Sequence, residues 1–309
     1  MHELQVDDSF WLDADQDKRD LDGLCAALHQ RAQSGAPMRG FQLKYAQLAG
    51  IDLVNHNQRT GHDLRDSDLY RADLQKAHLF GLDLRGSSLM KADLRGANLH
   101  CCDLRDCNLL GVQLDGARLD NVIWDRRLRQ ERQGRAHQRL GDSTAARRCF
   151  EEAEETYRNL RLHLEKAGLF EQAGLFFHRE MVMRRRQLPR YSGRRALSWL
   201  VDLLSGYGEK PLNVVLFSIA LIVFCGLLYF LVGVQHAGQP LGLALERGWL
   251  ANLDDLADCL YFSVVTFTTL GYGDITPHGI ARPIAAFEAF AGSFTMALFV
   301  VVFVKKMTR

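Results

Sequence analysis

The sequence predicts a mixed fold in three parts: a solenoid of short repeats, an α-helical linker and an all-α membrane domain. Leucine recurs at every fifth position through most of residues 41–124, which indicates a repeat architecture. Two long apolar segments lie between residue 212 and residue 304, and a charged stretch precedes them. The 309 residues are 47% hydrophobic and 24% charged, which is too polar for a chain that lies entirely within the membrane. A divided molecule is therefore expected.

Residues 1–40 precede the repeats and begin with an acidic stretch. We expect one helix in this segment, from about Asp17 to Gln33, and expect the segment to cap the open end of the solenoid.

The repeat region covers residues 41–124. A period of five fits neither an α-helix nor a β-strand, and some four coils of about twenty residues are expected. The interruption at residues 54–60 is interpreted as an inserted loop. Beyond it the leucines are Leu64, Leu69, Leu74, Leu79, Leu84, Leu89, Leu94, Leu99, Leu104, Leu109, Leu114 and Leu119, each with a mostly small residue two positions earlier.

This pattern resembles the pentapeptide-repeat family. The resemblance implies a right-handed quadrilateral β-helix with one repeat per side and with leucines and small residues stacked inside. The family includes proteins that imitate DNA by their surface charge. Residues 41–124 hold ten Lys or Arg against eleven Asp or Glu, so no nucleic-acid partner is expected. A scaffold or sensor role is expected instead, with an unidentified cytoplasmic ligand or protein partner.

The linker, residues 125–195, is expected to form a helical hairpin. Asp142 or Ser143 caps a helix that runs over residues 145–167 and ends before Gly168, and a second helix covers residues 170–187. Their predicted shared apolar seam consists of Tyr157, Leu160, Leu164, Phe170, Ala173 and Phe177. Residues 196–210 follow as a short helix suited to the membrane surface, with Trp199, and a turn at Gly206-Tyr207-Gly208.

Residues 211–309 are expected to form the membrane domain. The segments 212–234 and 283–304 can each cross a hydrocarbon core of about 30 Å at about 1.5 Å per residue. Basic residues precede the first segment and follow the second, among them Arg184, Arg190, Lys210 and Lys305. The positive-inside rule then predicts a multi-pass protein of a bacterial inner membrane with both termini in the cytoplasm. We expect no cleavable signal peptide.

Between the two spans, residues 268–274 read Thr-Thr-Leu-Gly-Tyr-Gly-Asp after an expected helix at residues 255–267. A pore that replaces the water shell of an ion needs consecutive backbone carbonyls on one axis, and Gly271 and Gly273 tolerate the backbone that this arrangement demands. The run resembles the selectivity filter of two-transmembrane potassium channels.

The resemblance implies that Thr269 offers hydroxyl and carbonyl oxygens to K⁺, that Leu270, Gly271 and Tyr272 add carbonyl rings, and that Gly273 completes the filter. K⁺ is then the permeant ion, and no cofactor is expected. Because one filter strand supplies oxygens on only one side of the ion, a homotetramer embedded in lipid is expected.

The same resemblance assigns supporting roles around the filter. The Tyr272 ring would pack near Phe262 and Thr266, and Tyr261 would be the partner of Asp274. Thr268 would precede the ion-binding residues.

The second span contains one ionisable residue, Glu288, which needs a partner in the pore helix, a neighbouring subunit or water; its charge is left open. Gly292 is either a gating hinge or a small residue that allows close packing against the pore helix. By alignment with similar channels, Ser293, Met296 and Val300 would face the water-filled cavity.

Seven cysteines, an odd number, fall mostly in the repeats and helices, which argues against disulfides in a cytoplasmic setting. Cys102 and Cys107 occupy inward small-residue positions, so packing is favoured over metal binding. No set of nucleophile, base and oxyanion donor suggests an enzyme. A potassium-selective channel, gated or assembled by the repeat domain, is the expected function. The alternatives are a membrane-anchored scaffold with a nonconducting pore and a weakly selective cation channel; the gating stimulus is left open.

Overall fold

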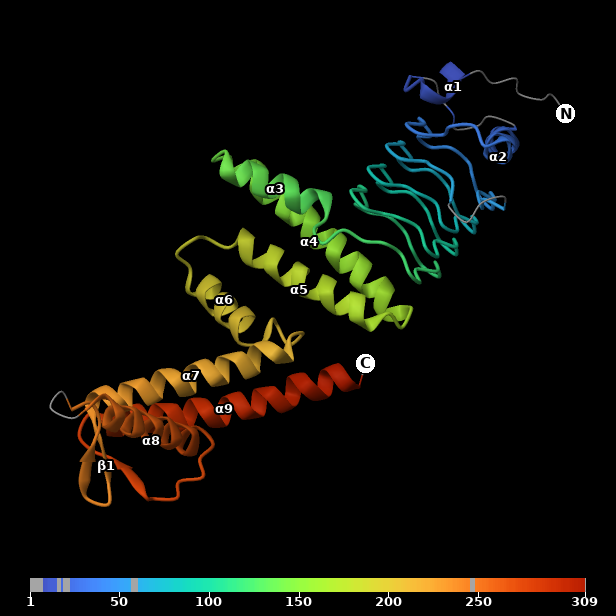
Figure 1. The fold of residues 1–309 in the computed structure, drawn as a ribbon. Helices are drawn as coiled ribbons and strands as arrows, with labels where there is room; N and C mark the ends of the chain where they lie inside the picture. The colour runs from blue at the N-terminus through green and yellow to red at the C-terminus, as the bar shows by residue number, and fades with distance from the viewer. Residues whose placement is uncertain (1–7, 16–17, 19–22, 57–60, 245–247, 309) are drawn as a thin grey trace. The chain divides into compact units, whose positions relative to one another are not determined.

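The computed structural model describes residues 8–15, 18, 23–56, 61–244 and 248–308. The chain forms two compact units, residues 1–195 and residues 196–309, and each is described by itself. Figure 1 shows their elements in chain order.

Two short helices begin the first unit, α1 (Asp8–Leu12) and α2 (Leu24–Ser34). The helix predicted for residues 17–33 is confirmed from residue 24 onward, and Gly23 at φ 86° directly precedes α2. Residues 16–17 and 19–22 lie outside the described residues. Trp11 is buried and stacks on Phe41, with ring centroids 4.9 Å apart, at the start of the repeats. This contact places α1 over the first coil.

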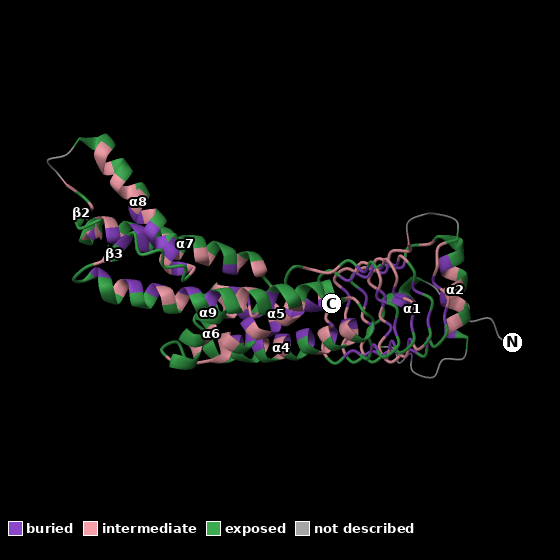
Figure 2. Cartoon of the chain, turned by 90° about the horizontal axis from the view of Figure 1, so that it is seen from below, coloured by how far each residue is buried: buried purple, intermediate pink, exposed green. Residues whose placement is uncertain are grey.

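The repeat region winds into stacked coils joined by parallel bridges. Asp63 pairs with Asp83, and Asp83 pairs with Asp103, so these coils take 20 residues each, which is four repeats of five. In the first coil Gln42 pairs with Asp68, so this coil takes 26 residues, six more than the regular coils. The extra length confirms the insertion predicted after residue 53. The leucines are buried in ladders such as Leu64, Leu84 and Leu104, and Figure 2 shows buried residues along every coil.

The backbone explains the period of five. A residue with positive φ recurs at every fifth position from Asp66 to Asn121, and it stands in a turn closed by a hydrogen bond such as Ala72 N to Leu69 O. Each repeat is therefore one side and one corner of the coil.

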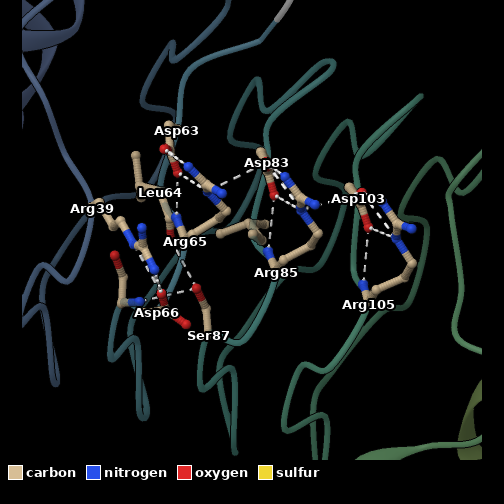
Figure 3. A network of polar contacts seen from close by, with 12 residues as sticks. Arg39, Asp63, Leu64, Arg65, Asp66, Asp83, Arg85, Ser87, Asp103 and Arg105 are labelled. Carbon is tan, nitrogen blue, oxygen red and sulfur yellow. Dashed lines mark hydrogen bonds and ion pairs between the residues drawn. The ribbon is translucent and has the colours of Figure 1, made fainter.

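A row of charged pairs runs along one face of the coils (Figure 3). Within a coil Arg65 donates to Asp63 at 2.6 Å, and Arg85 donates to Asp83 at 2.6 Å. Arg65 also lies 3.7 Å from Asp83 in the next coil, and Arg85 lies 3.6 Å from Asp103. The arginine hydrogen bond holds the pKa of Asp63 below its ordinary value. Opposite charges thus neutralise each other along this face, in agreement with the charge balance of the sequence.

The two cysteines inside the coils pack as small residues. Cys102 Sγ donates to the carbonyl oxygen of Leu79 at 2.8 Å, and Cys107 Sγ donates to that of Leu84 at 2.9 Å. Burial raises the pKa of Cys102 to about 12. Among the described residues there is no group of three His, Cys, Asp or Glu side chains that could hold a metal ion.

The linker contains three helices rather than the predicted two: α3 (Arg129–Arg139), α4 (Ser143–Lys166) and α5 (Phe170–Gln187). The side chain of Asp142 accepts a hydrogen bond from Ala145 N and so caps α4. The predicted seam is partly wrong, because Phe170 is exposed and Phe176 is buried against Tyr157 instead. The register of α5 therefore differs from the predicted one.

The second unit contains α6 (Gly193–Ser205), which starts in the first unit, and then α7 (Pro211–Val232), α8 (Trp249–Phe267) and α9 (Ala281–Met307). Three short strands, which the sequence did not predict, form an antiparallel sheet in the order β2 (Gln239–Leu241), β1 (Val234–His236), β3 (Ile275–Pro277). Helices α7 and α9 are long and apolar enough to cross a membrane. Their apolar side chains are largely exposed, unlike those of a core helix in a soluble protein.

Candidate functional site

The segment 268–274 leaves the C-terminal end of α8 and enters β3. Thr268 caps α8, and Leu270 N donates to Val265 O at 3.0 Å, so the last turn of the helix fixes the start of the segment. At the other end, β3 pairs with β1, which begins two residues after α7 ends. The segment is thus held at both ends by elements of the same unit.

The backbone of this segment alternates in conformation. Thr269, Gly271 and Gly273 have φ values of 57°, 56° and 81°, whereas Leu270 and Tyr272 are not among the positive-φ residues. In a strand, successive carbonyls point to opposite sides; a reversal of handedness at every second residue turns them toward the same side. The positive φ of Thr269 is uncommon for a residue with a side chain. The segment can therefore present a row of carbonyl oxygens.

Residues 269–274 are exposed in the single chain, with Leu270 at 60% and Tyr272 at 68%. No other part of the described chain covers the Leu270 and Tyr272 side chains.

The side chains predicted to support this segment lie as follows. Tyr261 on α8 hydrogen-bonds Asp274, the pairing that the sequence predicts. Phe262 is buried and packs edge-on against Tyr229 of α7, with ring centroids 4.8 Å apart. Since the Tyr272 ring is exposed, its predicted bracing by Phe262 is not made within one chain. Thr268 donates to Val264 O at 2.7 Å, and Thr266 O accepts from Thr269 N at 3.0 Å.

Glu288 is fully buried where α7, α8 and α9 meet. Tyr229 of α7 donates to its Oε2 at 2.6 Å, and Ser263 of α8 contacts its Oε1. Ser263 Oγ also lies 2.8 Å from the carbonyl oxygen of Ile222. One carboxyl group therefore links all three helices. Sequence reasoning missed Tyr229 and Ser263, although polar residues within apolar membrane segments were a usable signal.

Gly292 lies against the end of α8. A Cβ built at this position would stand 2.1 Å from the carbonyl oxygen of Phe267, a distance that no side chain tolerates. Of the two roles predicted for Gly292, close packing against the pore helix is the one with a visible contact.

The residues predicted to face a cavity lie along one length of α9. Ser293, Met296 and Val300 are exposed in the single chain, and Ser293 donates to Ala289 O at 3.0 Å. At the far end of α9, Lys305 forms an ion pair at 2.6 Å with Glu209, which precedes α7. This pair was not predicted from the sequence.

Two protein families match the chain. Residues 216–309 match the ion channel family, and residues 87–123 match eight copies of the pentapeptide repeat. The C-terminal region is an ion channel domain. With its two apolar helices it fits a two-transmembrane channel, and the chain is a membrane protein. Neither family is a family of enzymes.

Individual relatives match shorter parts. LctB from Geobacillus stearothermophilus is 48% identical over 49 residues, which cover 16% of this chain and 37% of LctB. LctB from Bacillus caldotenax is 47% identical over 49 residues, with the same coverage. The match thus spans well under half the length of these relatives. Among solved structures, HetL, a pentapeptide repeat protein from the cyanobacterium Nostoc, is 33% identical over 29% of this chain and 51% of its own, with a TM-score of 0.15.

Proposed function

We propose that this protein is a potassium-selective channel in which four copies place residues 268–274 around one axis. The observation that carries the proposal is the alternating backbone of this segment within an ion channel domain. Carbonyls of Thr269, Leu270, Gly271 and Tyr272 would replace the water shell of K⁺, and Gly273 would complete the filter.

Three further features support the proposal. Residues 269–274 are exposed in one chain, as expected for a surface that faces other copies. Helix α8 ends one residue before the filter, so its negative dipole end favours a cation there. Basic residues before α7 and after α9 favour an inner-membrane protein with both termini in the cytoplasm.

The test is ion flux through the purified full-length protein in liposomes under a K⁺ gradient, with K⁺ and Na⁺ compared. We expect K⁺-selective flux that Tyr272→Ala abolishes or makes unselective, because in the proposed assembly of four copies the Tyr272 ring, exposed in one chain, would brace the filter.

Tyr207→Ala is the matched control. Tyr207 stands in the chain's other Gly-Tyr-Gly sequence, the turn after α6, where its hydroxyl lies 2.7 Å from Ser198 Oγ. This variant is expected to keep selectivity. Equal K⁺ and Na⁺ flux in the unaltered protein would instead indicate a weakly selective cation channel, and a folded assembly without flux would indicate a scaffold.

A further inference from the structure

A cleft of about 570 Å³ lies in the first unit, between the start of α4 and the end of α5. Four arginines line it, and there is no Asp or Glu among the residues that line it. Arg147 comes from α4, Arg186 from α5, Arg190 from the turn that follows, and Arg195 from the first turn of α6. A concave surface with four guanidinium groups and no acidic side chain attracts anions.

The positive charge of this cleft is only partly compensated. Arg147 pairs with Glu151 at 3.0 Å on the exposed surface. Arg186 donates to Gln138 Oε1 at 2.9 Å and lies over the Phe150 ring, while its buried Nε has no hydrogen-bond partner. Arg195 donates to the carbonyl oxygen of Leu188 at 3.1 Å. Several guanidinium N–H groups in the cleft thus donate to neutral acceptors, and Arg186 Nε has no hydrogen-bond partner.

Burial and nearby positive charges both act on Arg186. Burial and the neighbouring Arg135 lower the pKa of its guanidinium, and Arg185 and Arg195 add to the effect against the opposing influence of Glu131. An anion in the cleft would offset these positive charges.

Uncharged groups in the same cleft suit a phosphate group. The hydroxyls of Ser143 and Thr144 lie in the first turn of α4 and line the cleft. Guanidinium groups bind phosphate oxygens in pairs, and the cleft has room for more than a simple ion.

We propose that this cleft binds a phosphate-bearing anion, either a soluble one of nucleotide size or the headgroup of an anionic lipid. Such a ligand joins α4, the end of α5 and the first turn of α6. The binding claim is independent of whether the pore conducts.

The test uses the full-length protein in nanodiscs of neutral phosphatidylcholine, titrated calorimetrically with pyrophosphate and with ATP. A second set of nanodiscs contains phosphatidic acid, and the thermal unfolding midpoint is compared between the two sets. The variants are Arg147→Gln and Arg190→Gln, which change exposed side chains and so preserve folding. The controls are Arg148→Gln and Arg184→Gln, which remove the same charge from exposed positions of α4 and α5 outside the cleft.

For a soluble ligand, we expect pyrophosphate or ATP to bind, and each cleft variant to bind about tenfold more weakly, while the controls bind as the unaltered protein does. For a lipid headgroup, we expect a higher unfolding midpoint in phosphatidic acid nanodiscs that the cleft variants lose and the controls keep. Either pattern supports the site. Absence of both effects, or equal losses in cleft and control variants, overturns the proposal.

Discussion

Gly292 has no room for a side chain, since a Cβ would lie 2.1 Å from the carbonyl oxygen of Phe267. Gly292→Ala therefore forces α9 away from the end of α8, which leads directly into residues 268–274. We expect a loss of roughly 1–3 kcal/mol of stability, as for overpacked cores, together with loss of selective flux. The thermal unfolding midpoint and the liposome assay measure the two effects.

A second variant separates packing from hinge bending. Ala289→Gly restores a glycine one turn away in α9 but leaves the clash in place. We expect the double variant Ala289→Gly with Gly292→Ala to lose as much stability and selective flux as Gly292→Ala alone. Recovery of flux in the double variant would show that Gly292 acts as a hinge.

Glu288 allows a sharper prediction because its partners are known. Ser263 Oγ lies within hydrogen-bonding distance of both Ile222 O and the Glu288 carboxyl, but its hydroxyl has only one proton to donate. If that proton goes to Ile222 O, the group at position 288 must donate a proton to Ser263 Oγ for both contacts to be hydrogen bonds. Glu288→Gln supplies such a donor and is expected to change stability by less than about 1 kcal/mol. Glu288→Ala leaves the buried Tyr229 hydroxyl without an acceptor and should cost about 1–3 kcal/mol.

Chemical denaturation or thermal unfolding of both variants in the same detergent checks this prediction. Equal destabilisation by Gln and Ala would mean that the negative charge itself is required.

At the level of single residues, the sequence predicted contacts between residues that are near each other in the chain. Tyr261 and Asp274 lie on either side of residues 268–274, and the structure gives a hydrogen bond between their side chains. The partners of Glu288 were not predicted, because Tyr229 and Ser263 come from two other helices and only their packing brings them together.

At the scale of elements, the ion pair between Glu209 and Lys305 joins the start of α7 to the end of α9. If the inner end of α9 moves outward on opening, this pair favours the closed state. Lys305→Ala and Glu209→Ala are each expected to raise resting K⁺ flux about two- to fivefold, which corresponds to roughly 0.5–1 kcal/mol.

The double variant with both charges exchanged, Glu209→Lys with Lys305→Glu, is expected to return flux to the original level. Lys306→Ala serves as the control, because it removes an exposed charge from the next position. Equal increases from Lys305→Ala and Lys306→Ala would point to net charge rather than to the pair.

Elements with a strong sequence pattern were predicted, and elements with a weak pattern were missed. The repeats and both spans carry long periodic or apolar signals and were predicted almost to their ends. Helix α3 was missed because its sequence, Arg129–Arg139, is rich in Arg and Gln and has no apolar stripe. Strands β1, β2 and β3 have three residues each, too few for a period of two to be visible.

At the scale of the whole molecule, the linker helices belong with the repeats. Gln130 of α3 donates to Asn108 at 2.7 Å, Asn159 of α4 donates to Val112 O at 2.8 Å, and the Trp124 ring packs edge-on against Phe176 of α5. These contacts cover the last coil. A truncation between repeats and linker therefore exposes a surface that is normally covered, whereas a truncation after residue 195 follows the boundary of the unit.

This difference gives a prediction about the role of the N-terminal unit. Deletion of residues 1–195 is expected to leave a domain that assembles as a tetramer and conducts K⁺, because α7, α8, α9 and the three strands all lie beyond the boundary. Deletion of residues 1–125 should give a lower yield and more aggregation, since it leaves α3, α4 and α5 without the coil they pack against. Light scattering after size exclusion and liposome flux measure both outcomes. If the shorter deletion were tetrameric and the longer one monomeric, the linker helices would be what assembles the pore, and the N-terminal unit would serve assembly rather than gating.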